Sequence, residues 1–307
     1  GCVGVGKDKY SGNQTKIFFL NCKWLSQMRL LILLILLPLF SQGQVIRTNP
    51  YYKPSVVTGC ADADAVAWIA ASGMSDTTGL CKFFRQLKDS SALWDSLQAG
   101  YLFLGITENE VKFNIKNPAN TDAAFRLTFS GTWTFSTSGA SETGSSYAET
   151  YYTPSSDANL NSSHISFYSQ NSGSVGSLLG AGTSGLINGL YLYIEIGNYY
   201  TKNFGSSGAS EMPTPAPAST QGFFINSRIN STEYNIYRNY INKSTQSNTS
   251  SARTINSIRL MQINGSSFYG DFKVSFASIG RGLTDTQARA LNNIVEELMD
   301  ARGIGVQ

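Results

Sequence analysis

Histidine is almost absent from this chain of 307 residues, which contains only His164. Zinc sites in proteins draw most of their ligands from several histidines or from paired cysteines. A Ser-His-Asp triad would need His164 as its base, and no G-x-S-x-G nucleophile elbow accompanies it. The sequence therefore excludes a His-based zinc site and gives no support to a serine hydrolase. We expect His164, inside the predicted strand HISFYSQ (164–170), to be a structural or surface residue.

The N-terminal region also lacks a hydrophobic run long enough to cross a membrane. Its apolar stretch, Leu30–Phe40, contains eleven residues that are apolar apart from one proline, whereas a spanning helix needs about 20. A single basic residue precedes this stretch and small residues follow it, which is typical of a secretory signal peptide. We therefore interpret residues 1–27 as upstream translation and residues 28–43 as a signal peptide. Cleavage after Gly43 would leave a secreted or cell-envelope protein that begins at Gln44.

Charge is scarce, since only 14% of the residues are Asp, Glu, Lys or Arg and the formal net charge is +3. Residues 1–43 contribute five basic side chains and one acidic side chain, so residues 44–307 carry a formal charge of −1. Nucleic-acid-binding proteins generally present a clustered basic surface. This composition predicts none, and its abundance of Gly, Ser, Thr, Asn and Tyr is typical of extracellular β proteins with long polar loops.

Paired carboxylates are missing as well. Glycoside hydrolysis needs two carboxylates at about 5.5 Å or 6.5–9.5 Å from each other, which alternate positions of a strand could supply. Glu195 is the single acid of the predicted strand YLYIEIGN, while Glu108 and Glu110 have the spacing but lie in a predicted turn, TENE. No catalytic residue can be named from the sequence, which argues against an enzyme without excluding one whose carboxylates meet only in the folded chain.

Two cysteines remain after residue 43, Cys60 and Cys81. Export would permit a disulfide between them. Both flank a predicted helical hairpin that turns near Gly73, and a rise of 1.5 Å per residue puts them about 7–8 Å out of register. A disulfide needs Cα atoms within roughly 7 Å. We therefore expect two free, buried thiols, although the sequence leaves the bridged alternative open.

The hydrophobic pattern divides the remaining chain into three parts. Residues 44–100 form a short helical lead-in of three predicted helices. The first helix ends at Gly73, the second begins after Ser75 and the third ends at Gly100. Residues 101–280 alternate with a period of two, which predicts a β sandwich or barrel with turns rich in Gly, Ser and Asn. Residues 281–307 form a C-terminal helix that packs on this β domain. A Thr284/Gln287 capping box starts that helix and Gly303 ends it.

The predicted strands are 101–105, 111–116, 123–130, 132–137, 147–153, 164–170, 189–197, 222–229, 233–241, 254–263 and 271–279. The proline-punctuated stretch 211–220 is a predicted loop.

Exposed aromatic rings with nearby amides and hydroxyls are what glycan binding requires. Tyr199, Tyr200 and Phe204 follow the predicted strand 189–197, and we take these three as candidate carbohydrate-binding residues. The alternative is that they pack in the core, since tyrosine is common in strands and half of each alternating set faces inward.

Several phrases resemble a group of uncharacterised concanavalin A-like (LamG-type) proteins found in tailed phages, as virion or tail-associated components, and in Bacteroidetes. They are DAAFRLTFSGTWTFSTSGA (122–140), YAETYYTPSSDANLNSSHISFYS (147–169), GFFINSR (222–228) and, most specifically, FASIGRGLTDTQARALNNIVEEL (276–298). The segment YRNYI (237–241) departs from the group, because Tyr240 stands where we expect the glycine of a hairpin turn. That turn should therefore have a different shape.

The resemblance implies a mainly β fold, a two-sheet antiparallel jelly-roll sandwich with an N-terminal helical segment and a C-terminal helix. It transfers no catalytic residue. Some LamG domains use calcium, so calcium is a possible cofactor here, with no ligands that we can assign.

Two classes of function remain. The first is a non-enzymatic recognition or adhesion module that binds a surface glycan or protein, in the cell envelope or on a phage virion, with homo-oligomerisation left open. The alternatives are a glycan-cleaving enzyme of the sandwich class and a purely structural virion protein.

Overall fold

The computed structural model describes residues 2–5, 17–20, 59–90, 92–172, 175–183, 186–195, 198–205, 210–211, 219–240 and 242–307. The expected signal peptide, residues 28–43, and most of the proline-punctuated loop lie outside these ranges. The chain forms two units, Gly1–Lys53 and Pro54–Gln307. In the first unit β1 (Cys2–Val5) pairs antiparallel with β2 (Ile17–Leu20). All further description concerns the second unit.

The helices of the second unit are α2 (Ala63–Ser72), α3 (Leu80–Asp89), α4 (Leu93–Ser96), α5 (Glu108–Val111), the 3-10 turn η2 (Asp122–Ala124), α6 (Pro154–Asp157) and α7 (Asp285–Ala301). The strands are β3 (Leu97–Leu102), β4 (Thr128–Ser136), β5 (Gly139–Glu149), β6 (Ser163–Ser169), β7 (Gly176–Ala181), β8 (Leu190–Glu195), β9 (Asn198–Asn203), β10 (Ser210–Glu211), β11 (Gly222–Arg228), β12 (Glu233–Arg238), β13 (Asn242–Ser247), β14 (Arg259–Leu260), β15 (Ile263–Asn264) and β16 (Lys273–Gly280).

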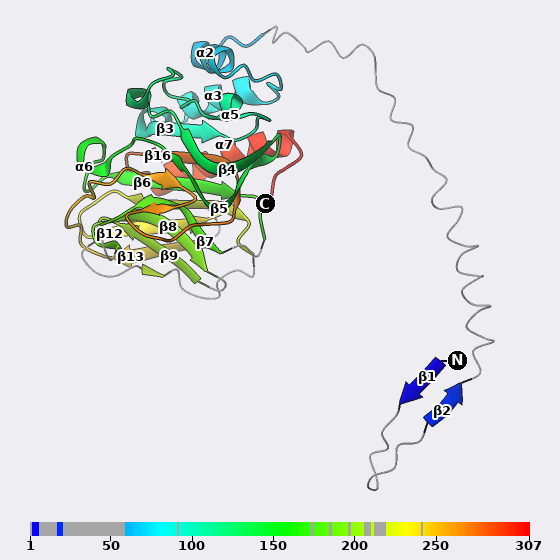
Figure 1. Ribbon diagram of the computed structural model, residues 1–307. Coiled ribbons are helices and arrows are strands. Elements are labelled where there is room, and N and C mark those ends of the chain that lie inside the picture. Colours follow the sequence, from blue (N-terminus) through cyan, green and yellow to red (C-terminus); the bar gives the residue numbers. More distant parts are fainter. Residues whose placement is uncertain are drawn as a thin grey trace. The chain divides into compact units, whose positions relative to one another are not determined.

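Fourteen strands of the described residues form one curled sheet, which makes the fold mainly β (Figure 1). Its order is β10-β9-β8-β7-β14-β5-β16-β6-β11-β12-β13, with β3 paired to β16, β4 to β5 and β15 to β7. The pairings are antiparallel except for the short parallel contact between β15 and β7. This arrangement brings β16, near the C-terminus, between β5 and β6 in the middle of the sheet.

The central strands bury both faces. On β11, Phe224 belongs to the core inside the curled sheet, while Phe223 and Ile225 belong to a second core under the helices. Helices α2, α3, α4 and α7 cover that second core, where Phe83 contacts the ring of Phe276 from β16. Burial on both faces explains why such strands are apolar and aromatic at consecutive positions.

The structure confirms the C-terminal helix that the sequence pattern predicts. Thr284 accepts a hydrogen bond from the backbone N–H of Gln287, and the side chain of Gln287 accepts one from the backbone of Thr284. Leu291 and Val295 are fully buried against the helical core, and Gly303 follows the helix with φ +68°. A capping box and an amphipathic stripe depend on neighbouring residues only, so the sequence could specify this helix.

Several predicted elements are wrong at the level of single segments. Residues 111–116 are not a strand, because α5 ends at Val111 and turns follow. Residues 254–263 are mainly irregular, and residues 97–100, expected as helix, belong to β3 because they pair with β16. The two strands predicted at 123–130 and 132–137 are one strand, β4, whose register shifts around Gly131.

The prediction of two free, buried thiols is also wrong. Cys60 and Cys81 form a disulfide, with Cα atoms 5.5 Å from each other. The expected mismatch assumed continuous helices on both sides of Gly73. In the structure α2 begins only at Ala63 and α3 only at Leu80, so non-helical residues precede both helices and the helical rise does not set the separation.

The turn between β12 and β13 also differs from expectation. Asn239 and Tyr240 have φ of 49° and 51°, so Tyr240 adopts the left-handed backbone that a glycine would favour, and the turn is not reshaped to avoid it. The ring of Tyr240 stacks on Tyr237, with centroids 5.8 Å from each other, and the guanidinium of Arg289 lies 4.4 Å from its centroid. These contacts offset the cost of the left-handed conformation.

We predict that the disulfide contributes substantially to stability. It closes a loop with a sequence separation of 21, and cross-links of this length lower the entropy of the unfolded chain enough to stabilise the fold by about 3 kcal/mol. The variant Cys60→Ser/Cys81→Ser should lose about that free energy of unfolding in urea denaturation. Adding reductant to the wild-type protein should produce a similar loss and should leave the variant unchanged. Identical unfolding curves for wild type and variant would contradict the prediction.

Candidate functional site

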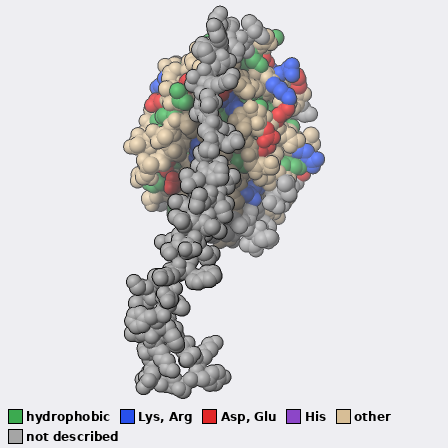
Figure 2. All heavy atoms as spheres, turned by 90° about the vertical axis from the view of Figure 1, so that its right-hand side faces the viewer, with side chains coloured by type: hydrophobic (Ala, Val, Ile, Leu, Met, Phe, Trp, Pro, Cys, Tyr) green, Lys and Arg blue, Asp and Glu red, His purple; other side chains and the backbone are tan. Residues whose placement is uncertain are grey.

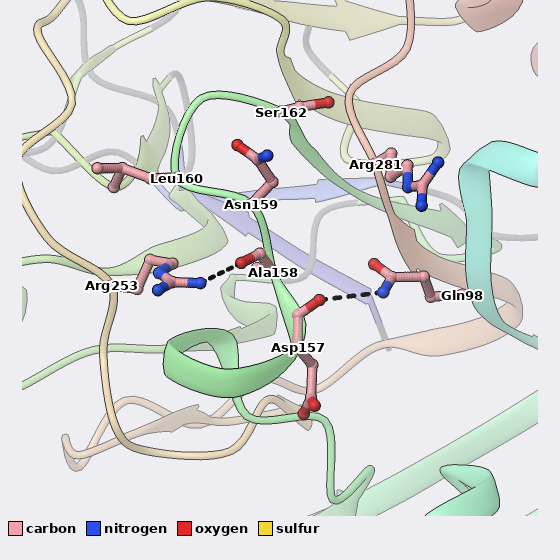
Figure 3. Close-up of a pocket in the computed structure, with 8 residues that line it drawn as sticks. All are labelled: Gln98, Asp157, Ala158, Asn159, Leu160, Ser162, Arg253 and Arg281. Atoms are coloured by element: carbon pink, nitrogen blue, oxygen red, sulfur yellow. Dashed lines mark hydrogen bonds between the residues drawn. The ribbon is translucent and has the colours of Figure 1, made fainter.

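A polar pocket of about 630 Å³ lies beside α6 (Figure 3). This volume falls in the range of small-ligand sites. Its wall combines Gln98 of β3, the turn from α6 into β6, the segment before β14 and the residue after β16. The lining residues are Gln98, Asp157, Ala158, Asn159, Leu160, Ser162, Arg253 and Arg281.

Hydrogen bonds fix one wall of the pocket. The side-chain amide of Gln98 donates to the carbonyl of Asp157 at 3.0 Å and accepts from the hydroxyl of Tyr152 at 2.8 Å. Arg253 donates from Nη1 to the carbonyl of Ala158, as Figure 3 shows. The carboxylate of Asp157 accepts the backbone N–H of Thr153 at 2.7 Å, which holds α6 in place.

His164 supports the opposite wall from below. Its Nδ1 lies 2.5 Å from the carbonyl oxygen of Arg281, and its Nε2 lies 3.0 Å from Oγ of Ser278. A carbonyl can only accept, so Nδ1 carries the proton, Nε2 accepts from Ser278, and Ser278 in turn accepts from Ser166 at 2.6 Å. All three side chains are fully buried, and burial lowers the pKa of His164 to about 4. His164 is thus a structural residue, which is one of the two roles expected from the sequence, and it does not lie on the surface.

The backbone around Arg281 is held at several points. Its N–H donates to the carbonyl of Ser96 at 2.8 Å, its own carbonyl contacts His164, and the next N–H, that of Gly282, donates to Oγ of Ser162 at 3.1 Å. The side chain of Arg281 is exposed and lines the pocket. A fixed backbone therefore presents a solvated guanidinium.

The three aromatic residues singled out in the sequence lie elsewhere. Tyr199 is 3% exposed and donates its hydroxyl to the carbonyl of Ser219, and Phe204 is fully buried in the core. Burial raises the pKa of Tyr199 to about 12. These two rings offer no open face for a sugar, so their assignment as exposed platforms is corrected. Tyr200 is partly exposed, because strand alternation turns it to the other face of β9.

Tyr200 belongs to a surface aromatic group that sequence reasoning missed. Tyr193, opposite Tyr200 on β8, lies 5.8 Å from it between ring centroids and 5.3 Å from Phe268. The side chain of Phe268 is 44% exposed. The period-two pattern of 189–197 could have placed Tyr193 with Tyr200 only if the pairing of β8 with β9 were known.

Glu142 is a buried acid with no hydrogen-bond partner. It lies opposite Trp133 in the β4–β5 pair, is 2% exposed, and neither carboxylate oxygen accepts a hydrogen bond. Burial, and then the charge of Asp271, raise the pKa of Glu142 to about 7. The charge of Asp271 thus acts on a carboxyl group that is far from it in the sequence.

No group of three or more His, Cys, Asp or Glu side chains able to hold a metal ion occurs in the described part of the chain. The calcium suggested by the sequence resemblance therefore has no such cluster there. Across the same residues no helix has the length and apolar character needed to cross a membrane. On the side that Figure 2 shows, basic and acidic side chains are scattered over a larger surface of other side chains and backbone.

Comparison with known proteins gives distant similarities. No family model matches the chain, and no curated protein matches it. Among solved structures, the chain is similar to domain 4 of a GH43 extracellular arabinanase from Geobacillus stearothermophilus in complex with arabinotriose, with 13% identity, a TM-score of 0.42, and 64% of this chain and 98% of that chain covered.

Two other solved structures are similar over part of their length. Trypanosoma rangeli sialidase has 13% identity and a TM-score of 0.45, with 74% of this chain and 39% of that chain covered. The binding domain of botulinum neurotoxin serotype D has 11% identity and a TM-score of 0.44, with 68% and 52% covered. The chain thus spans less than two thirds of each of these two proteins.

The buried His164 predicts a pH dependence of stability. Its folded pKa of about 4 lies below its unfolded value of 6.5, so only the unfolded state binds a proton between these values. Stability from this group is complete above pH 6.5 and is lost as the pH falls towards 4, by about 3 kcal/mol in total. The difference in free energy of unfolding between wild type and His164→Gln should therefore shrink by about that amount from pH 7 to pH 4. A constant difference, measured by urea denaturation across this range, would contradict the prediction.

Proposed function

We propose that this chain is a recognition module that binds a surface glycan in the pocket beside α6. The observation that carries the proposal is the polar, loop-built pocket of about 630 Å³. Pockets for drug-like molecules are lined mainly by apolar side chains, whereas six of the eight residues that line this one have polar or charged side chains. A polyhydroxylated ligand matches such a lining, and Leu160 supplies an apolar contact for the C–H face of a sugar.

The finer features of this proposal rest on the sequence. We propose that the curled sheet is a two-sheet jelly roll of the concanavalin A-like, LamG type, in a protein exported by the signal peptide at 28–43 to the cell envelope or medium. The Cys60–Cys81 disulfide supports export, because the cytosol generally keeps thiols reduced. A virion location is the alternative, and a surface protein is the alternative ligand.

Glycan-array binding of the purified protein tests the pocket. Binding should weaken about tenfold in Asn159→Ala/Ser162→Ala, because each variant residue removes a hydrogen-bonding group from the lining. Thr137→Ala, an exposed hydroxyl on the β4–β5 connection, is the matched control and should bind as the wild type does. An array without a selective signal would overturn the proposal. So would selective binding that the pocket variant leaves unchanged.

A second candidate function, glycan cleavage, is favoured by one observation. Glu142 is buried beside Trp133, and its pKa of about 7 keeps much of it protonated near neutral pH, as a general acid requires. Asp271 is exposed and close enough to raise that pKa. In such a reaction the acid protonates the leaving oxygen, water adds to the sugar carbon, and the second carboxylate acts as base or nucleophile.

We predict that any hydrolytic activity would depend on both acids. Release of reducing ends from a glycan panel should fall at least a hundredfold in Glu142→Gln and in Asp271→Asn, and wild-type activity should decline above pH 7 as Glu142 loses its proton. Glu108→Gln, an exposed acid far along the chain, is the control. No release of reducing ends by the wild type, or release that Glu142→Gln retains, would reject this candidate.

A further inference from the structure

Most hydrogen-bond acceptors that line the pocket beside α6 already accept a hydrogen bond from another group of the protein. The carbonyl of Asp157 accepts from Gln98, the carbonyl of Ala158 accepts from Arg253, and the carbonyl of Asn159 accepts the backbone N–H of Ser162. The side-chain oxygen of Asn159 accepts the backbone N–H of Asn161 at 2.9 Å. Figure 3 shows the carboxylate of Asp157 pointing away from the other labelled side chains. Few acceptors therefore remain for a ligand that donates.

Donors, in contrast, remain unused. Neither Arg253 nor Arg281 forms an ion pair within the described residues, and the side chain of Arg281 makes no hydrogen bond there. The amide nitrogen of Asn159 and the hydroxyl hydrogen of Ser162 have no acceptor among the same residues. A ligand that fills the pocket meets donors, two of them cationic.

The two arginines lie apart, and Arg253 is fixed through its guanidinium whereas Arg281 is fixed through its backbone. Figure 3 shows Arg253 and Arg281 on opposite sides of the turn that carries Asn159. Arg253 is tied to Ala158, and the backbone of Arg281 rests on the buried His164 and on Ser96. An exposed arginine without a partner is common on protein surfaces. A pair of arginines anchored at the two sides of a pocket that otherwise offers donors is a more specific arrangement.

We propose that the pocket selects an acidic sugar, whose carboxylate is bound by Arg281 while Asn159, Ser162 and Arg253, on the other side of the turn, donate to its other oxygens. A planar guanidinium matches a carboxylate through two parallel hydrogen bonds, and such charge-assisted pairs are stronger than neutral ones. This inference rests on the proposed glycan-binding function and names the ligand class of the same site.

The test compares matched acidic and neutral ligands. Oligogalacturonate and the same oligosaccharide with its carboxylates reduced to alcohols are titrated calorimetrically into the full-length protein, next to a sulfated oligosaccharide. We expect the carboxylate form to bind at least tenfold more tightly than the reduced form, and its affinity to fall as salt rises. Arg281→Gln should remove at least tenfold of the affinity for the acid and leave the reduced form unaffected. Arg281→Lys should retain only part, because an ammonium lacks the planar pair of donors.

Arg85→Gln, an exposed arginine on α3 outside the pocket, is the control and should bind as the wild type does. The side chain of Arg281 has no hydrogen-bond partner in the described structure, so its variant should unfold at the wild-type temperature, which the same samples verify. Equal binding of both forms, unaffected by Arg281→Gln, would overturn this inference and leave glycan recognition standing. Preference for the sulfated ligand would overturn the carboxylate assignment. Absence of binding to any glycan on the array and in calorimetry would overturn both proposals.

Discussion

The part of the fold around the pocket beside α6 depends on the hydrogen bonds of one buried guanidinium, that of Arg228. It is fully buried at the end of β11 and donates to the carbonyls of Asn203 at 2.8 Å, Asn248 at 2.8 Å, Asn230 at 3.2 Å and Glu233 at 3.3 Å. Burial lowers its pKa, and carbonyl dipoles rather than a carboxylate compensate the charge. A cation that loses its partners inside a protein is costly, so these four strand ends and turns must stay where the guanidinium needs them.

The segment after β16 connects Arg228 with the pocket, because it packs against the backbone of Arg228 and also carries Arg281. A Cβ on Gly282 would meet the carbonyl oxygen of Arg228 at 1.8 Å, so only glycine lets the chain pass this close. The residue before it, Arg281, is the one whose backbone contacts the buried His164 and whose side chain lines the pocket. A second buried network, in which Asn203 contacts Ser163 and Asn226, fixes β6 beneath the turn at 158–162. Buried polar contacts beneath the pocket therefore hold in place the segments that carry its lining side chains.

The parts that sequence reasoning could predict depend on local patterns. The capping box of α7 and the core strands around 164–170 and 222–228 follow from neighbouring residues and from period-two or continuous apolar runs. The same reasoning failed for Cys60 and Cys81, because non-helical residues before each helix changed their separation. It also failed for Tyr199 and Phe204, since alternation shows that two faces exist without telling which one the second layer covers.

The candidate site itself had no signal in the sequence. Gln98, the turn 157–162, Arg253 and Arg281 come from four separate segments, and none of them forms a motif alone. By itself the sequence determined a mainly β chain, a C-terminal helix and a structural or surface role for its one histidine, because periodicity, capping and composition act over a few residues. Only the tertiary structure decided which donors face one pocket and that the charge of Asp271 acts on Glu142. Those choices arise from strand order and from contacts between residues more than a hundred positions apart, which no local pattern records.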